Sequence, residues 1–323
     1  MNSGSEWAGR IAEQVAAGAP LEEALAALLA QQRASWPLLR EGEAGLAAAA
    51  VRRIEGGDGH VLLQANARRK ISTSASVDPA SVAQRPCFLC QDRLPAEERG
   101  VAFGDDYIAF CNPYPILPGH LSVVARQHRP QAIAGRARDL LLLSRSLGPC
   151  WSALYNGPRC GASAPDHLHF QAGQIDALPL EIDLDPPEAG AGALPFERFG
   201  RRGLMLWDWD AGALAERVEA AIEALQRIAG DWDEPLLNLI ARSDDVGTRV
   251  LLFPRARHRP RQFFARGEDH LLISPGALDM AGLIVVAEPT HLGRVDAAAV
   301  RDIYDQVTLD AARFAQLAAA VET

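Results

Sequence analysis

The chain has 323 residues, enough for one large domain or two fused halves with a substantial core. Apolar residues make up 48% and charged residues 23%, as in an ordinary globular protein. The 32 basic and 41 acidic residues give a net charge of -9, which argues against a general nucleic-acid binder because such proteins usually carry a basic excess. A nucleotide ligand is not excluded, since one phosphate cluster needs only a few local donors.

The first nine residues lack the basic-then-apolar arrangement of a signal peptide, and no apolar run approaches the length of a membrane span. Five cysteines, two of them as Cys87-x-x-Cys90, suit a reducing compartment better than a disulfide scaffold. We therefore expect a cytoplasmic protein with neither a membrane nor a nucleic-acid partner.

The first half alternates helices and strands. Leucines at helical spacing predict an amphipathic helix from Pro20 to Ser35, which Pro37 would end. "HVLLQAN" predicts a strand, and a polar loop follows it. Further along we expect strands at Tyr107–Cys111 and Leu121–Ala125 around a proline-rich turn, a helix over Arg136–Leu147, and strands in "CWSALYNG" and "DHLHFQAG".

The segment from about Ala177 to Pro195 is rich in Pro, Gly and Ala and is the best linker candidate. Beyond it we expect a strand in "GLMLWDWD", a helix over Ala213–Ile228, paired strands in "LLNLIAR" and "RVLLFPR", and a last helix from Ala297 to about Ala320.

Leu121–Gln131 and Leu251–Gln262 echo one another: each is an apolar strand that ends in basic residues and then His-Arg-Pro. Coincidence in an arginine-rich chain is the alternative. Because the flanking strand pattern also repeats, we favour a duplicated α+β unit.

Two histidines and a glutamine alternate in "DHLHFQ". In an extended strand alternate side chains share a face, about 6.6 Å apart at two residues' rise. His167, His169 and Gln171 therefore point one way, and Leu168 and Phe170 point into a core. A neutral imidazole can attack phosphorus, and the amide can donate to phosphate oxygens but cannot protonate a leaving group. The upstream Gly161–Ser163 loop has little bulk and offers backbone amides to phosphate. The alternative is that both histidines are core or metal residues.

These motifs carry a resemblance. "NPYPILPGHLSVVARQH", "YNGPRCGAS" and "DHLHFQ" resemble the histidine-triad superfamily, in particular its branch of galactose-1-phosphate uridylyltransferases, diadenosine tetraphosphate phosphorylases and GDP-hexose phosphorylases. With "CFLC" and "ISPGALDMAGLI", the pattern is most similar to the bacterial family DUF4922, from about residue 60 onward.

The resemblance implies an α+β fold of duplicated histidine-triad-like halves, with an antiparallel sheet and flanking helices, after an N-terminal helical segment. It implies a nucleotidyl-histidine intermediate on His169, with Gln171 and His167 beside it. From the resemblance we expect Asn156, the Gly161 loop and Ser163 to bind the substrate. Asn112, Arg69 and Lys70 are further candidate substrate-binding residues, the last two from a basic loop. The loop before His167 is about one residue longer than in several relatives, which puts the role of Ser163 in doubt.

A metal site is also expected. The C-x-x-C spacing lets Cys87 and Cys90 hold one tetrahedral zinc, with other ligands from elsewhere. The resemblance implies His128 and His167 as those ligands and a structural Zn²⁺, with no organic cofactor; His120 competes with His128. The alternative is a reduced thiol pair in a core.

Two basic clusters offer phosphate contacts. "NARRK" places Arg68, Arg69 and Lys70 in a loop, and "FPRARHRP" carries Arg255, Arg257 and His258 in the second half. A solvated loop explains the first equally well, and a remnant of the repeat explains the second.

We predict a nucleotidyltransferase of phosphorylase type that takes a nucleotide sugar or a dinucleoside polyphosphate and passes the nucleotide to phosphate or a sugar phosphate. A hydrolase of the same superfamily and a non-catalytic nucleotide- or metal-binding protein are the alternatives, and a homodimer is compatible with the resemblance. The predicted parts are a helical segment (1–58), a catalytic half (59–178), a linker (179–195) and a second half without the motif (196–323).

Overall fold

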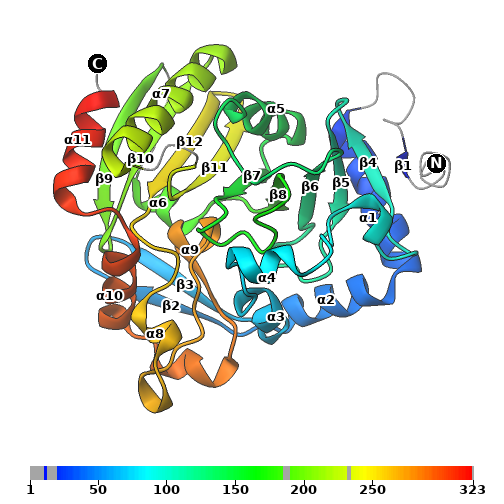
Figure 1. Cartoon of the computed structure of the whole chain (residues 1–323), viewed down its shortest axis with the longest axis horizontal. Coiled ribbons are helices and arrows are strands. Elements are labelled where there is room, and N and C mark those ends of the chain that lie inside the picture. Colours follow the sequence, from blue (N-terminus) through cyan, green and yellow to red (C-terminus); the bar gives the residue numbers. More distant parts are fainter. Residues whose placement is uncertain (1–10, 13–19, 185–189, 231–233, 322–323) are drawn as a thin grey trace.

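The computed structural model describes residues 11–12, 20–184, 190–230 and 234–321. Helices and strands mix along the chain, and one long sheet carries helices on one face and a smaller sheet on the other (Figure 1). The predicted α+β class is therefore confirmed. No helix within these ranges is long and apolar enough to cross a membrane.

The long sheet has ten strands. Every neighbouring pair is antiparallel except β1 with β4. In spatial order the strands are β1 (Ile11–Ala12), β4 (Gly100–Phe103), β5 (Tyr107–Cys111), β6 (Leu121–Ala125), β8 (His169–Gln174), β7 (Trp151–Asn156), β11 (Leu237–Asp244), β12 (Gly247–Pro254), β10 (Arg201–Asp208) and β9 (Gly192–Arg198).

The strand order makes the predicted duplication visible. Chain segments β5-β6-α5-β7-β8 and β9-β10-α7-β11-β12 occupy mirrored places on either side of the central pair β7·β11, with α5 at Ala137–Leu147 and α7 at Ala211–Ala229. The sequence echo pointed to a different equivalence, β6 with β12, and that alignment is wrong, because the counterpart of β6 is β10 and that of β12 is β8. Apolar strands that end in arginine recur in this chain. The similarity of the two segments therefore reflects amino-acid composition and not equivalent positions in the two halves.

Both faces of the sheet are buried. One face packs against α1 (Leu21–Ser35), α5 (Ala137–Leu147), α7 (Ala211–Ala229) and α11 (Ala311–Val321), with Trp151, Tyr155 and Phe170 in the core between them. The other face is covered by a three-stranded sheet of β2 (Val51–Glu55), β3 (His60–Ala65) and β13 (Leu283–Val286), together with α9 (Ala277–Met280) and α10 (Ala297–Val307).

The structure departs from the predicted elements in several places. Pro37 ends α1 as predicted but also begins a further helix, α2 (Pro37–Ala47), where proline fits the first turn. The last helix is not continuous from 297 to 320: it breaks after α10, where Thr308 bridges to Arg255 and Leu309 donates to the carbonyl of Pro254.

Short helices occupy loops: α3 (Lys70–Thr73), α4 (Pro79–Ala83) and α8 (Arg261–Phe264). The predicted linker holds α6 (Pro179–Leu184) and the start of β9, while 185–189 lie outside the described residues. Strand β3 pairs in parallel with β13 near the C-terminus, so residues 60–65 pack with the second half. The division of the chain at 58, 178 and 195 stays a prediction.

Helix α2 buttresses the proline-rich turn through a close backbone approach. A Cβ placed on Gly42 would lie 2.1 Å from the carbonyl oxygen of Pro113. Both groups belong to the backbone, so no side chain can move to relieve this overlap. On the same helix, a Cβ on Gly45 would meet only the side chain of Arg68, at 3.0 Å.

We expect Gly42→Ala to lower the free energy of unfolding by about 1–3 kcal/mol, the usual cost of overpacking, although alanine favours helix. Gly45→Ala is the matched control and is expected to be neutral or to stabilise by up to about 1 kcal/mol, because Arg68 can move. Chemical denaturation of both variants checks the pair; equal effects would contradict the close approach.

Candidate active site

His169 opens strand β8 and is almost fully buried, 4% exposed. Its Nδ1 lies 2.8 Å from the carbonyl oxygen of His167. A carbonyl only accepts hydrogen bonds, so Nδ1 carries the proton and Nε2 keeps its lone pair. The backbone is fixed as well: the His169 N–H donates to Oε1 of Gln131, and Nε2 of Gln131 donates to the carbonyls of His169 and Asn156.

Burial keeps the His169 ring neutral. Desolvation lowers the pKa of His169 to about 4, although the hydrogen bond to the His167 carbonyl opposes the shift. At neutral pH the side chain is therefore an uncharged imidazole with one free nitrogen, which is the form that attacks phosphorus.

Gln171, two residues on, is held by a histidine that the sequence analysis treated only as a rival metal ligand. His120 Nδ1 accepts from the N–H of Ile116 at 3.0 Å, so its proton must sit on Nε2. Nε2 lies 2.9 Å from Oε1 of Gln171 and donates to it. This bond fixes the amide, and its NH₂ group is left for a ligand.

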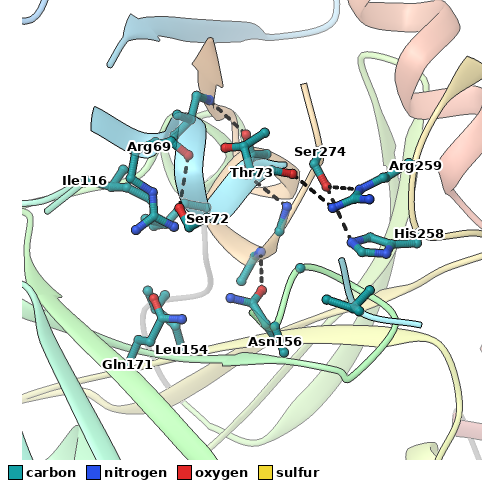
Figure 2. Close-up of a pocket in the computed structure, with 18 residues that line it drawn as sticks. Arg69, Ser72, Thr73, Ile116, Leu154, Asn156, Gln171, His258, Arg259 and Ser274 are labelled. Atoms are coloured by element: carbon teal, nitrogen blue, oxygen red, sulfur yellow. Dashed lines mark hydrogen bonds between the residues drawn. The ribbon is translucent and has the colours of Figure 1, made fainter. Parts of the chain in front are cut away.

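A cavity opens beside Gln171 between the two halves (Figure 2). Residues of β7, β8 and the loop after β7 form one wall, and the turn at α3 and residues of the second half form the other. The lining residues are Arg69, Ser72, Thr73, Val77, Ile116, Leu154, Asn156, Gly161, Ala162, Gln171, His258, Arg259, Ser274, Gly276, Ala277, Leu278, Asp279 and Val285.

Two glycines let the halves meet at this cavity. Gly161 has φ +104°, and a Cβ on it would lie 2.9 Å from Cα of Gly276. A Cβ on Gly276 would in turn lie 3.0 Å from Oδ1 of Asn156. The lack of bulk in the loop "CGAS" therefore lets the two backbones approach closely here. That its amides bind phosphate stays a prediction.

The cavity is rich in donors. The buried Nε atom of Arg69 has no hydrogen-bond partner in the described part of the chain, while its Nη1 donates to the Tyr114 carbonyl. Arg259 donates to Oγ of Ser274 and, across the cavity, to the carbonyls of Thr73 and Ala75. The one carboxylate among the lining residues, Asp279, already accepts from the N–H groups of Gly276 and Val285. The arrangement suits an anion.

The other predicted substrate residues lie elsewhere. Lys70 pairs with Glu288 at the surface, 3.0 Å apart. Asn112 accepts from the Tyr114 N–H and so supports the proline-rich turn. Ser163 is not among the lining residues; Ala162 is, and the Ser163 carbonyl accepts from Arg85.

Sequence reasoning missed the cavity residues Ser72, Thr73, Arg259, Ser274 and Asp279. The signals present were "ISPGALDMAGLI", which matched the resembled family without a chemical role, and the basic stretch "FPRARHRP", whose predicted phosphate contacts were Arg255, Arg257 and His258 rather than Arg259. Of the second-half basic cluster, His258 reaches the cavity and Arg255 is buried behind it.

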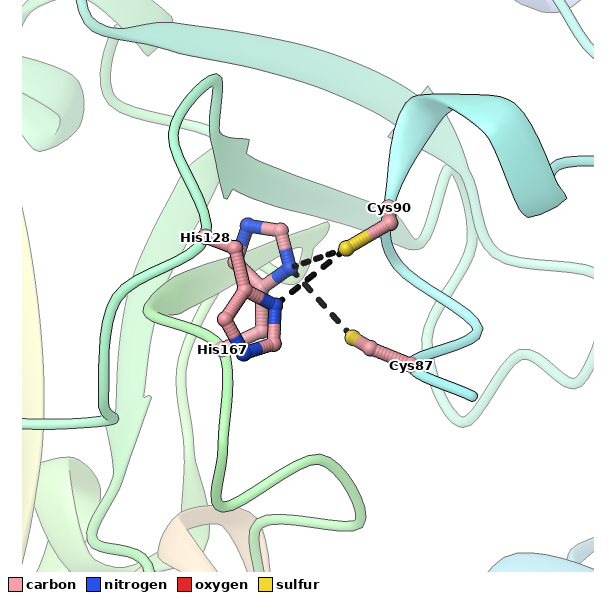
Figure 3. Close-up of side chains that lie close together, drawn as sticks. All are labelled: Cys87, Cys90, His128 and His167. Atoms are coloured by element: carbon pink, nitrogen blue, oxygen red, sulfur yellow. Dashed lines mark hydrogen bonds between the residues drawn. The ribbon is translucent and has the colours of Figure 1, made fainter. Parts of the chain in front are cut away.

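The predicted metal ligands come together (Figure 3). One ligand atom from each of Cys87, Cys90, His128 and His167 lies within 4.8 Å of the others. The Sγ–Nδ1 separations are 3.4 Å for Cys87 and His167, 3.2 Å for Cys90 and His128, and 3.7 Å for Cys90 and His167. A tetrahedral zinc places an N and an S ligand about 3.5 Å apart, and the three separations lie within about 0.3 Å of this value, so the donor set suits such an ion.

His167 presents the correct nitrogen to such an ion. Its Nε2 lies 2.8 Å from the carbonyl of Ala125 and donates to it, which leaves the Nδ1 lone pair facing the two sulfurs. His120 is bound to Gln171 instead, so the alternative that placed His120 in the cluster is wrong. The loop is anchored by Leu89, which packs on Ile108, Phe110 and Val124.

Comparison with protein families bears out the resemblance to DUF4922, and comparison with solved structures bears out the fold. Residues 28–174 match the family described as a domain of unknown function, DUF4922. The fold is similar to that of yeast Ap4A phosphorylase Apa2: TM-score 0.61 at 15% identity, over 90% of this chain and 95% of that chain. The same enzyme in complex with Ap4A gives a TM-score of 0.56 at 14% identity, over 87% and 97%. No curated protein is similar to this chain in sequence.

His120 makes stability depend on pH. Burial lowers its pKa to about 3, so the unfolded chain takes up a proton on this ring first, near pH 6.5. The neutral His120 ring contributes fully to the free energy of unfolding above pH 6.5, and this contribution is lost as the pH falls toward about 3. When the pH falls from 7.5 to 5.5, the free energy of unfolding of the wild type should decrease by about 1.4 kcal/mol more than that of His120→Gln, as measured by urea unfolding. Equal losses would show that His120 is protonated in the folded chain.

Proposed function

We propose that this protein is a nucleotidyltransferase of phosphorylase type, with His169 as the nucleophile. The observation that supports it is the tautomer: Nδ1 of His169 is tied to the His167 carbonyl, so Nε2 carries a free lone pair on the sheet face that also bears Gln171. Gln171 and Arg69 supply donors for the charge on a phosphoryl group.

The reaction has two displacements. Nε2 of His169 attacks the α-phosphorus of the donor, an N–P bond forms, and the P–O bond to the departing phosphate or nucleotide breaks with its electron pair. An oxygen of the acceptor then attacks the same phosphorus, the N–P bond breaks, and the imidazole is restored. Gln171 has no acidic proton, so the leaving group must depart as an anion already stable at neutral pH. A phosphate or phosphate ester satisfies this condition.

The donor we favour is a dinucleoside polyphosphate or a nucleoside diphosphate sugar, and the acceptor is phosphate or a sugar phosphate. The similar yeast phosphorylase structures contain AMP and Ap4A, which favours the dinucleoside polyphosphate. A hydrolase would replace the acceptor by water. A purely binding protein has no need of an imidazole with a free Nε2.

We also propose that Cys87, Cys90, His128 and His167 hold one structural Zn²⁺. The ion would fix the His167 ring, and the His167 carbonyl fixes His169, so its role is to orient the nucleophile. The catalytic half proposed for residues 59–178 contains all of these residues. A cytoplasmic location and a homodimer stay predictions.

Zinc content tests the cluster. The purified protein should hold close to one zinc per chain by elemental analysis, and Cys90→Ser should lose most of it and unfold at a lower temperature. Cys150→Ser is the matched control, because Cys150 is exposed and lies outside the cluster. Equal zinc in both variants, or none in the wild type, would contradict the site.

Intact mass spectrometry tests the nucleophile. After incubation with diadenosine tetraphosphate, ATP, GDP-mannose, GDP-glucose or UDP-glucose, the wild type should gain one nucleoside monophosphate, and the added mass identifies the base. His169→Ala should form the adduct at least about a thousandfold more slowly. His270→Ala should match the wild type, because the His270 ring packs on His291 and bonds the carbonyl of Gln262, away from Gln171.

The fate of the adduct separates the alternatives. Release of a nucleoside diphosphate on adding phosphate indicates a phosphorylase, and loss of the adduct in buffer alone indicates a hydrolase. No adduct from any donor would refute the covalent mechanism for these substrates.

A further inference from the structure

Arg255 is a buried cation with an unusual set of partners. It follows β12 and is 2% exposed. Nε donates to the carbonyl of Val307 at 3.1 Å, and Nη2 donates to the carbonyls of Arg257 and His258 at 3.3 and 3.1 Å. Nη1 donates to the Pro275 carbonyl at 3.0 Å and to Oδ1 of Asn238. Its five donors are all used, none on a carboxylate, so the guanidinium acts as a fixed donor inside the second half.

Arg255 determines which way the Asn238 amide faces. Guanidinium has no acceptor, so only the oxygen of Asn238 can face it. Asn238, 0% exposed, then directs Nδ2 to Oδ1 of Asn156 at 2.8 Å and to the Cys160 carbonyl at 2.6 Å. Asn238 and Asn156 are direct partners in the central β7·β11 pair, so the contact crosses from one half to the other.

Asn238 and the Ala277 N–H together determine which way the Asn156 amide faces. Oδ1 of Asn156 accepts from Asn238 and from the N–H of Ala277 at 2.7 Å. Among the described residues no hydrogen-bond partner takes Nδ2 of Asn156, and Figure 2 shows this nitrogen turned away from the Ala277 bond. Asn156 lines the cavity, so its free NH₂ is available to a ligand there.

We propose that Arg255 and Asn238 are positioning residues of the second half, which orient the Asn156 amide so that its NH₂ donates to the phosphoryl group bound in the cavity. This inference rests on the proposed function. The half without the His-x-His motif thereby fixes the amide oxygen of Asn156, just as His120 fixes the amide oxygen of Gln171 in the other half. Two amides, each able to offer either an oxygen or a nitrogen, are both set to donate.

A contact that only holds the two halves together would not need the two amides to face in this particular direction. An isolated Asn–Asn contact would hold two strands equally well with both amides reversed, but only the observed orientation leaves a donor in an anion site. The Ala277 N–H and the Cys160 carbonyl favour this orientation, and the buried guanidinium, which offers no acceptor, excludes the other one.

The wild-type protein gives the first test, without any nucleotide. The chain has few asparagines to resolve: Asn2, Asn66, Asn112, Asn156 and Asn238. With ¹⁵N-asparagine labelling, the pair of side-chain signals missing in Asn156→Asp belongs to Asn156. We expect that pair to exchange rapidly with solvent and to shift on adding inorganic pyrophosphate, while the Asn238 pair, bonded at both hydrogens, exchanges slowly. A protected Asn156 pair that ignores pyrophosphate would overturn the proposal.

The second test is Asn238→Asp, which keeps an acceptor for Arg255 but places an oxygen where Nδ2 donated. The Asn156 amide should then turn its NH₂ toward the introduced carboxylate, so its signals become protected and lose their response to pyrophosphate. Adduct formation on His169 should slow about 100-fold, as for loss of one oxyanion donor. Both substitutions remove the same donor, the Asn156 NH₂ group. The double variant Asn156→Asp with Asn238→Asp should therefore form the adduct little more slowly than either single variant.

Ser243→Ala is the matched control for damage to β11. Ser243 is buried on the same strand and bonds Ser144 and Thr248, away from the cavity. We expect this variant to lose stability yet keep the wild-type Asn156 signals and adduct rate. If the side-chain amide signals of Asn156 are unchanged in Asn238→Asp, the proposed positioning by Arg255 and Asn238 is overturned. If the wild type forms no adduct but shows the predicted amide exchange, only the proposed function is refuted.

Discussion

The hydrogen bond from Nδ1 of His169 to the carbonyl of His167 is the contact on which the site depends. It leaves Nε2 as the only nitrogen with a lone pair, and burial keeps the ring uncharged. The carbonyl is itself positioned because the His167 ring is held between the Ala125 carbonyl and the two cysteine sulfurs. A metal ion held by this cluster would therefore orient the proposed nucleophile through the peptide unit of His167.

The two halves share a topology but divide the work. The half that contains β7 and β8 carries the histidines, the C-x-x-C loop and Gln171. The half that contains β11 and β12 contributes the facing wall with Gly276 and Arg259, and the buried Arg255. A continuous ten-stranded sheet is what makes this possible, since β7 and β11 are adjacent and their side chains meet at fixed register.

Local patterns in the sequence were enough to predict the shared face of His169 and Gln171, the α+β class and the pairing of Cys87 with Cys90 at one metal, because strand alternation and short spacing determine them. The family resemblance supplied the other two ligands of the cluster, His128 and His167. Contacts between distant segments could not be predicted in this way. Nothing in the sequence indicates that Asn238 lies opposite Asn156, that His120 bonds Gln171, or that Arg259 reaches Thr73. The break after α10 has the same origin, a bridge between Thr308 and Arg255, residues far apart in the chain.

The most direct test of the account is the protonation state of His169, measured by ¹⁵N NMR of the histidine rings. The chain has eight histidines, so His169→Ala assigns the ring by difference. The account predicts that Nδ1 is protonated and Nε2 is not, and that the ring stays neutral from pH 8 to well below the ordinary histidine pKa, because burial lowers that pKa to about 4. A proton on Nε2, or a charged ring at neutral pH, would leave no free lone pair and would contradict a nucleophilic His169.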